Sequence, residues 1–163
     1  VDLWRTHLFT ASDHEAPSLR DRLAFGGAPA PGQRLPDLTW SGDDHEERLH
    51  DHLQGTAFHL LLFPGLHARE DDLAALATLA RGVEARHGDA IRVHLVHRGA
   101  APPAGWEGAA IPDREGIVHE VFGAHGECLY LIRPDGHIGF RGQPAQQGPL
   151  SAYLDRIFTR PPG

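Results

Sequence analysis

The sequence predicts an α/β protein in which helices flank a central mixed β-sheet, with an antiparallel hairpin and a final helix in its C-terminal part. Three observations lead to this fold class. Apolar runs of strand length alternate with stretches whose apolar residues recur at helical spacing. Residues 127–142 have the pattern of a strand, a tight turn and a second strand. Residues 150–158 then have the pattern of an amphipathic helix.

The hairpin is the stretch on which we expect the other elements to pack. Residues 128–132 are apolar or aromatic, which suits a pleated surface. The Arg-Pro-Asp-Gly sequence at 133–136 favours a turn, because proline presets φ, aspartate bonds its own backbone and glycine tolerates a positive φ. Ile138 and Phe140 then alternate with other residues, so the return strand has one apolar face.

The N-terminal part is predicted to be a linker. Residues 1–9 alternate loosely and fit a strand or an extended connector, while residues 20–25 are ambiguous. A Gly/Pro-rich hinge at 26–33 cannot continue a helix or a strand. We therefore assign residues 1–33 to a linker and residues 34–163 to one compact domain.

The remaining elements give the order β-α-β-α-β-α-β-β-α. In chain order they are a strand at 35–40, a helix at 46–53 capped by Asp43 or Asp44, a strand at 57–63, a helix at 71–86, a strand at 91–97, a loop at 99–108 and a short helix at 115–122. The β-α-β segments imply parallel strands with right-handed crossovers. A β-α-β half followed by a β-β-α half is the thioredoxin-like plan.

Composition narrows the classes of function. The net charge of −7 argues against a nucleic-acid or anionic-membrane surface, since both need a basic patch. No apolar run approaches the ~20 residues that span a bilayer, and without a visible leader the expected location is cytoplasmic. One cysteine allows no internal disulfide, and the absence of methionine suggests a piece of a longer polypeptide.

The chemistry expected of a thioredoxin-like fold is missing. Such a fold places its reactive thiol just after the strand at 57–63, where a helix N-terminus lowers a thiol pKa. Residues 64–71 contain no cysteine, which excludes a disulfide oxidoreductase or a thiol peroxidase acting there. Cys128 begins an apolar strand, so we expect a buried and inert thiol; a reactive role would require a cationic, exposed setting.

No catalytic, cofactor-binding or metal-binding residue is predicted in the chain. The thirteen histidines are interpreted as scattered surface residues: His50 and His52 do not share a helix face, and His94 and His97 fall on opposite faces of a strand. The acidic groups at 43–47 and 70–72 are interpreted as helix caps. Neither a dinucleotide-binding glycine motif, a P-loop nor a nucleophile elbow occurs.

The hairpin sequence Tyr-Leu-Ile-Arg-Pro-Asp-Gly-His-Ile-Gly-Phe-Arg at 130–141 resembles a recurring ending of class A flavin-dependent aromatic hydroxylases, which include phenol and polyketide hydroxylases. Residues 31–37, 49–53 and 58–63, with the Tyr-Leu pair of the last helix, agree in order, and the resemblance covers roughly residues 29–158. It implies a thioredoxin-like C-terminal domain that has lost its redox cysteines.

The resemblance also implies a function for a larger parent protein. That parent would be an FAD-dependent monooxygenase that uses NAD(P)H and O₂. Its flavin-binding domain would lie upstream, and this domain would have a structural role that includes contacts in a homodimer. Because the family's FAD-binding glycines lie upstream, no catalytic residue is carried over to this chain. The same order of elements also resembles peroxiredoxins. The alternatives are therefore a free-standing thioredoxin- or peroxiredoxin-like binding module without the catalytic cysteine, and a peroxidase that uses Cys128.

Overall fold

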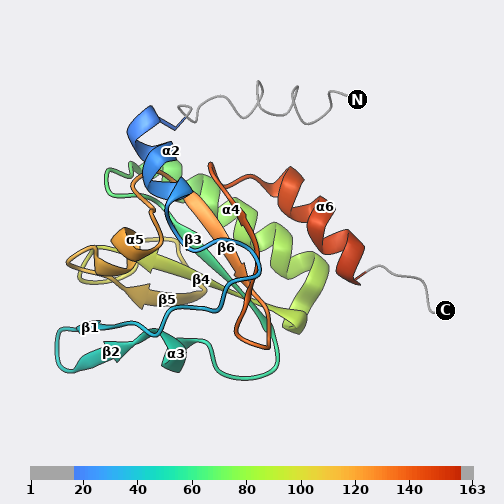
Figure 1. Ribbon diagram of the computed structural model, residues 1–163, viewed down its shortest axis with the longest axis horizontal. Helices are drawn as coiled ribbons and strands as arrows, with labels where there is room; N and C mark the ends of the chain where they lie inside the picture. The colour runs from blue at the N-terminus through green and yellow to red at the C-terminus, as the bar shows by residue number, and fades with distance from the viewer. Residues whose placement is uncertain (1–16, 159–163) are drawn as a thin grey trace.

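The computed structural model describes residues 17–158, and its centre is a five-stranded mixed β-sheet (Figure 1). The strand order is β5-β4-β3-β6-β7. The bounds of the strands are Phe58–Phe63 for β3, Ile91–His97 for β4, Ala109–Pro112 for β5, Cys128–Ile132 for β6 and Ile138–Gly142 for β7. β3, β4 and β5 are parallel, while β6 and β7 are antiparallel to their neighbours. This confirms the predicted mixed sheet.

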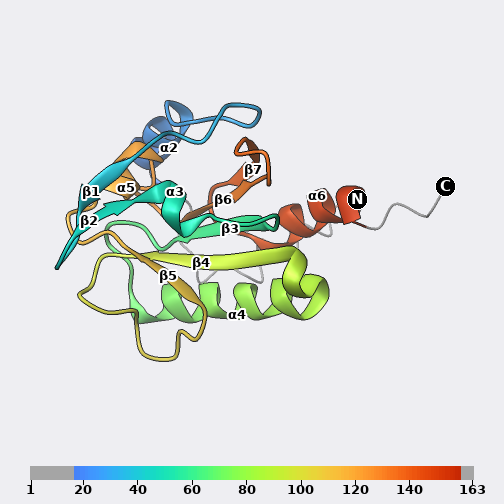
Figure 2. The same cartoon turned by 90° about the horizontal axis from the view of Figure 1, so that it is seen from below.

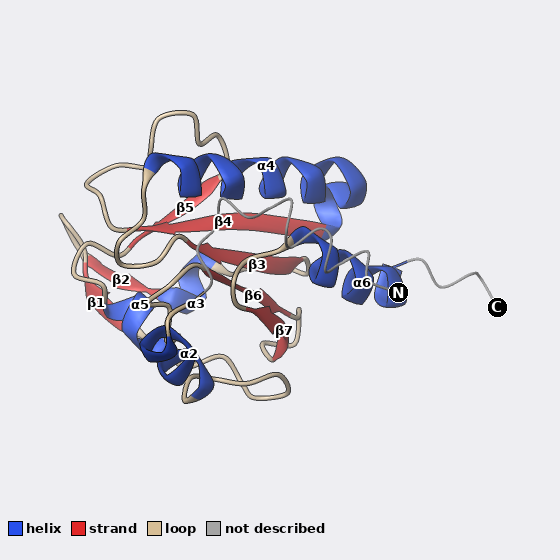
Figure 3. Cartoon of the chain, turned by 90° about the horizontal axis from the view of Figure 1, so that it is seen from above, coloured by secondary structure: helices blue, strands red, loops and turns tan. Residues whose placement is uncertain are grey.

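Helices cover both faces of the sheet (Figure 2). One face carries α4, Glu70–His87, and α6, Gln147–Phe158, whose apolar residues pack on Leu60, Leu62 and Leu95. The other face carries α2, Leu19–Gly26, α3, Leu49–His52, and α5, Ile117–Val121. Figure 3 shows α4 and α2 on opposite sides of the strands. A sheet covered on both faces explains why β3 is almost continuously apolar.

The hairpin forms as the sequence predicts, and it is central to one layer of the core. The Gly136 N–H donates to the Arg133 carbonyl at 2.9 Å, and Gly136 has a φ of 83°, which closes the turn. Tyr130 in β6 is fully buried, and its hydroxyl donates to the Phe122 carbonyl at 2.8 Å. Its ring lies 4.8 Å from that of Phe122, so the hairpin and the residue that follows α5 pack as one unit.

The predicted helix at 46–53 is wrong over its first half. Residues 46–48 instead form β2, Glu46–Arg48, which pairs antiparallel with β1, Thr39–Ser41. Only residues 49–52 are helical, and neither predicted aspartate caps them, because their N-cap is Arg48 without a side-chain cap. Tertiary packing accounts for the difference: the buried Trp40 of β1 donates from Nε1 to the Pro112 carbonyl at 2.7 Å, which ties the β1–β2 pair to the sheet.

Two further differences concern weak local signals. β5 was not predicted: only four residues long, it begins directly after the predicted loop at 99–108 and pairs with the second half of β4. The ambiguous residues 20–25 are helical in α2, where the Ser18 hydroxyl accepts from the Asp21 N–H at 3.1 Å as a helix cap. The predicted strand or connector at 1–9 lies outside the described residues. The boundary at residue 33 stays a prediction.

The described helices include none that is long and apolar enough to cross a membrane.

Candidate functional site

The candidate site lies where β3 ends and α4 begins, since a helix N-terminus after a buried strand is the place at which this fold can activate a reactive group. The loop at 64–69 joins the two elements and packs on residues 125–127. The Leu66 N–H donates to the His125 carbonyl at 3.0 Å. Gly65 has a φ of 94°, and a Cβ there would lie 3.0 Å from the same carbonyl oxygen. A side chain at position 65 would therefore push the two segments apart.

Acidic residues of α4 itself cap its N-terminus. The Arg69 N–H donates to Asp72 Oδ2 at 2.9 Å, and Glu70 and Asp71 complete an acidic first turn, which confirms the prediction for this group. These carboxylates offset the positive end of the helix dipole. The dipole is consequently less able to stabilise a thiolate or another bound anion at this place.

A cavity of about 330 Å³ adjoins this helix start, and the Glu127 side chain lines it. Burial and, to a smaller extent, the nearby charge of Asp72 raise the pKa of Glu127, and a hydrogen bond from the Ala145 backbone opposes the rise; the resulting pKa is about 7. A carboxyl group with this pKa exchanges protons near neutrality. The lining includes no cysteine, and its serine, Ser18, is engaged in the cap of α2. The site can therefore bind protons and polar groups but offers no thiol.

Sequence reasoning missed Glu127. The only signal was an acidic residue directly before a fully apolar strand, a pattern that a solvated acidic residue also produces. Its partial burial depends on residues between 64 and 72 and at 144–145, which the fold brings to it from other parts of the chain.

Cys128 follows Glu127 and is fully buried, as predicted. It lies opposite Phe63 in the register of β6 and β3, so its backbone is next to the candidate site while its side chain belongs to the core. Burial raises the pKa of the Cys128 thiol well above its usual range, and the charge of Glu127 raises it further, against a smaller opposing effect of Arg141. That its thiol is inert stays a prediction, which these surroundings favour.

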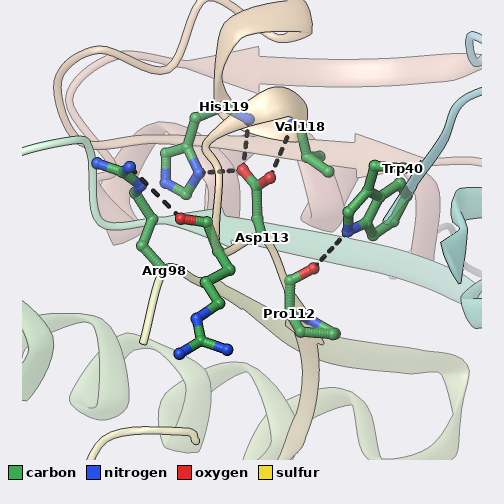
Figure 4. A network of polar contacts seen from close by, with 7 residues as sticks. Trp40, Arg98, Pro112, Asp113, Val118 and His119 are labelled. Atoms are coloured by element: carbon green, nitrogen blue, oxygen red, sulfur yellow. Dashed lines mark hydrogen bonds and ion pairs between the residues drawn. The ribbon is translucent and has the colours of Figure 1, made fainter. Parts of the chain in front are cut away.

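A second polar group lies inside the molecule at the start of α5 (Figure 4). Asp113 and His119 are both fully buried, and Asp113 Oδ2 lies 2.7 Å from His119 Nδ1. The Asp113 carboxylate also accepts from the Val118 N–H at 3.0 Å and from the His119 N–H at 2.8 Å. Asp113 thus accepts hydrogen bonds from free backbone N–H groups in the first turn of α5 and orients the His119 imidazole, which is a structural use of an Asp–His pair.

The interpretation of the histidines as surface residues is wrong for four of them. His59, His94, His97 and His119 are buried. His59 and His94 come from the paired strands β3 and β4, and His59 Nδ1 lies 2.9 Å from His94 Nε2. Desolvation by burial and, to a smaller extent, the charge of His59 lower the pKa of His94 to about 3. Burial also lowers the pKa of His59, so the pair is neutral near pH 7. The strand positions are buried because both faces of the sheet are covered.

The acidic group at 43–47 is likewise not a helix cap. Glu47 is buried in β2, and its two carboxylate oxygens lie 2.7 Å from His52 Nε2 and from His45 Nε2. The carboxylate is thus hydrogen-bonded to side chains of the protein. Across residues 17–158, no three His, Cys, Asp or Glu side chains come together in a way that could hold a metal ion.

Comparison with known proteins decides the family. A family model described as aromatic-ring hydroxylase, C-terminal, matches residues 28–161. The chain belongs to this family. A comparison with curated proteins gives no match.

Solved structures agree with this family and with the fold. The aromatic-ring hydroxylase domain is similar to a crystal structure of aklavinone-11 hydroxylase in complex with FAD and aklavinone, with 26% identity, a TM-score of 0.55 and coverage of 82% of this chain but 22% of that one. It also resembles a putative thiol:disulfide interchange protein DsbE from Chlorobium tepidum, with 16% identity, a TM-score of 0.60 and coverage of 78% and 96% of the two chains. A thiol peroxidase from Chromobacterium violaceum has 13% identity, a TM-score of 0.59 and coverage of 81% and 87%.

These likenesses confirm the thioredoxin-like fold and the resemblance drawn from the hairpin. The two thiol proteins show the fold alone, since their identity to the hydroxylase domain is low. The domain spans about a fifth of the length of aklavinone-11 hydroxylase. In this hydroxylase C-terminal domain, the cavity at the end of β3 is therefore lined by capping acids and a half-buried Glu127, and by no thiol.

Proposed function

We propose that this chain is the C-terminal domain of an FAD-dependent monooxygenase that uses NAD(P)H and hydroxylates an aromatic or polyketide substrate. The domain itself is not catalytic and binds no FAD. It has a structural role, in which it packs against an upstream flavin-binding domain and contributes to contacts in a cytoplasmic homodimer. Support comes from the family match and from the related hydroxylase solved with FAD and aklavinone.

The main support for a structural role is the set of residues at the end of β3. A thiol-dependent enzyme needs a cysteine at a positive helix end, and residues 64–71 supply none. The acidic first turn of α4 and the raised pKa of Glu127 make the place unfavourable for an anionic nucleophile. The fold is retained here while the electrostatics of thiol chemistry are absent, as expected of a domain kept for its shape.

The test compares the 163-residue chain with the complete product of its gene. We expect the 163-residue chain to purify without flavin absorbance and to reduce neither hydroperoxide nor disulfide. We expect the complete product to bind FAD and to oxidise NAD(P)H in the presence of an aromatic substrate. Stoichiometric FAD on the 163-residue chain, or peroxide consumption abolished by Cys128→Ser, would contradict the proposal.

A free-standing thioredoxin-like binding module is the second candidate, and the polar cavity of about 330 Å³ at the end of β3 is the observation that favours it. The reading frame separates the two candidates. A βαβ unit with a Gly-x-Gly-x-x-Gly motif encoded upstream in the same frame supports the monooxygenase, and a frame without one supports the module.

A further inference from the structure

The helix α2 presents an apolar surface to solvent. Leu19 and Leu23 are one helical turn apart and therefore lie on the same face of α2. The two residues are 65% and 69% exposed, the highest values among the large apolar residues of the described part of the chain. Arg20 and Arg22 beside them are also exposed. This face, which we call the α2 leucine face, is an apolar strip with a basic rim.

The α2 leucine face is held in a fixed orientation on the domain. Arg141 of β7 donates from Nη1 to the Phe25 carbonyl at 2.6 Å, and its guanidinium lies 4.3 Å from the centre of the Phe25 ring. Gly123, just after α5, allows α2 to approach closely, because a Cβ at position 123 would lie 2.4 Å from the Ala24 carbonyl oxygen. The exposed leucines are therefore part of a rigid element anchored to the hairpin and to the end of α5.

The place of α2 in the chain indicates what covers it. The family match begins at residue 28, so α2 lies just on the N-terminal side of the C-terminal domain. In the related hydroxylase the matching part is 22% of the chain, so most of such a protein lies outside this domain. For a C-terminal domain, that remainder precedes it in the sequence. The polypeptide therefore reaches the domain through α2.

We propose that the α2 leucine face packs against the flavin-binding domain that precedes this domain in the parent protein, on an apolar patch whose rim carries carboxylates. This inference rests on the proposed function. Burying two leucines removes apolar surface from water, and carboxylates facing Arg20 and Arg22 would fix the orientation of the contact.

The test is thiol labelling of Leu23→Cys in the 163-residue chain and in the complete gene product, read by mass spectrometry of the labelled peptide. Cys128 is buried and does not compete. The matched control is Ala85→Cys, an exposed position on α4, on the opposite side of the sheet (Figure 3). In the 163-residue chain we expect both positions to label at similar rates. In the complete product we expect labelling at position 23 to slow at least about tenfold and labelling at position 85 to stay unchanged.

Two results would overturn the inference. Equal rates at position 23 in the two proteins would mean that the preceding domain does not cover the face. Slow labelling of position 23 in the 163-residue chain would mean that something other than the preceding domain covers the α2 leucine face. A labelling rate that depends on protein concentration would identify a second copy as the cover, and a rate that does not would point to residues 1–16. A complete product that lacks FAD would refute the proposed function, whereas an FAD-containing product with an unprotected position 23 refutes only this inference.

Discussion

Replacing the buried His94 with glutamine is expected to remove one source of acid sensitivity from the fold. In the folded protein the pKa of His94 is lowered to about 3 by burial and by the charge of His59, whereas the unfolded chain has the ordinary value of 6.5. Between these two values the unfolded state binds a proton that the folded state does not, so the stability due to neutral His94 is present above pH 6.5 and falls as the pH drops.

The magnitude follows from the unfolded-state pKa. At about pH 5.5 roughly nine-tenths of the unfolded chains carry the proton, which favours unfolding by about 1.4 kcal/mol relative to about pH 7.5. The effect is almost independent of the folded-state value once that value is well below pH 5.5. Glutamine does not titrate and retains a group that can hydrogen-bond to His59 Nδ1.

The assay is urea unfolding of the wild-type protein and of His94→Gln at both pH values. We expect the stability of the wild type relative to the variant to fall by about 1.4 kcal/mol between the two conditions. The exposed His67 gives the matched control, His67→Gln, for which we expect no such change. Titrating groups that do not contact His94, including Glu127, are present in all three proteins and cancel in the comparison. His59 contacts His94, so the measured difference reports on the pair. An unchanged difference for His94→Gln at the two pH values would refute the reasoning.

Three further predictions follow from the environment of single residues. The pKa of Glu127 is raised from 4.5 to about 7, so its contribution to stability is present below pH 4.5 and is lost as the pH rises through 7. Glu127→Gln should therefore stabilise the protein by about 1–3 kcal/mol at about pH 8, measured by urea unfolding, and by far less in acid. The Cys128 thiol should label only after denaturation, and rapid labelling of the native protein would contradict its burial. Gly123→Ala should lower the stability by more than about 2 kcal/mol in thermal unfolding, because position 123 combines a φ of 59° with a clash of the new Cβ against the Ala24 carbonyl. Gly32→Ala, at a φ of 89° with no atom nearby, should lower it by less. Equal losses for the two variants would mean that the clash at position 123 costs little free energy.

The elements predicted correctly are those with strong local patterns. The predicted strand at 91–97 is β4, and α4 covers the predicted helix at 71–86 with one further residue at each end. The hairpin follows because its turn residues and the alternation of its second strand agree. The helix has apolar residues at a period of about 3.6, and the apolar face that this period defines is the one the fold buries. The strands at 91–97 and 128–132 are apolar-rich runs of strand length, and the fold buries both of their faces.

The failures are short segments whose structure depends on distant partners. Residues 46–48 have a helical composition but pair with β1, because Trp40 anchors that strand to Pro112. β5 has only four residues and exists by pairing with β4. The buried histidines were assigned to the surface because a polar residue in a strand gives no indication of how completely the two faces of that strand are covered.

The sequence by itself determined the fold class, the family and the absence of a cysteine at the end of β3, because each depends on residue types at fixed spacings along the chain. The tertiary structure alone decided which polar residues lose their contact with water. The pKa values of Glu127 and His94 are shifted, and the Asp113–His119 pair is buried, only because segments far apart in sequence pack around these residues. Desolvation is a property of the packed molecule, and no local pattern encodes it.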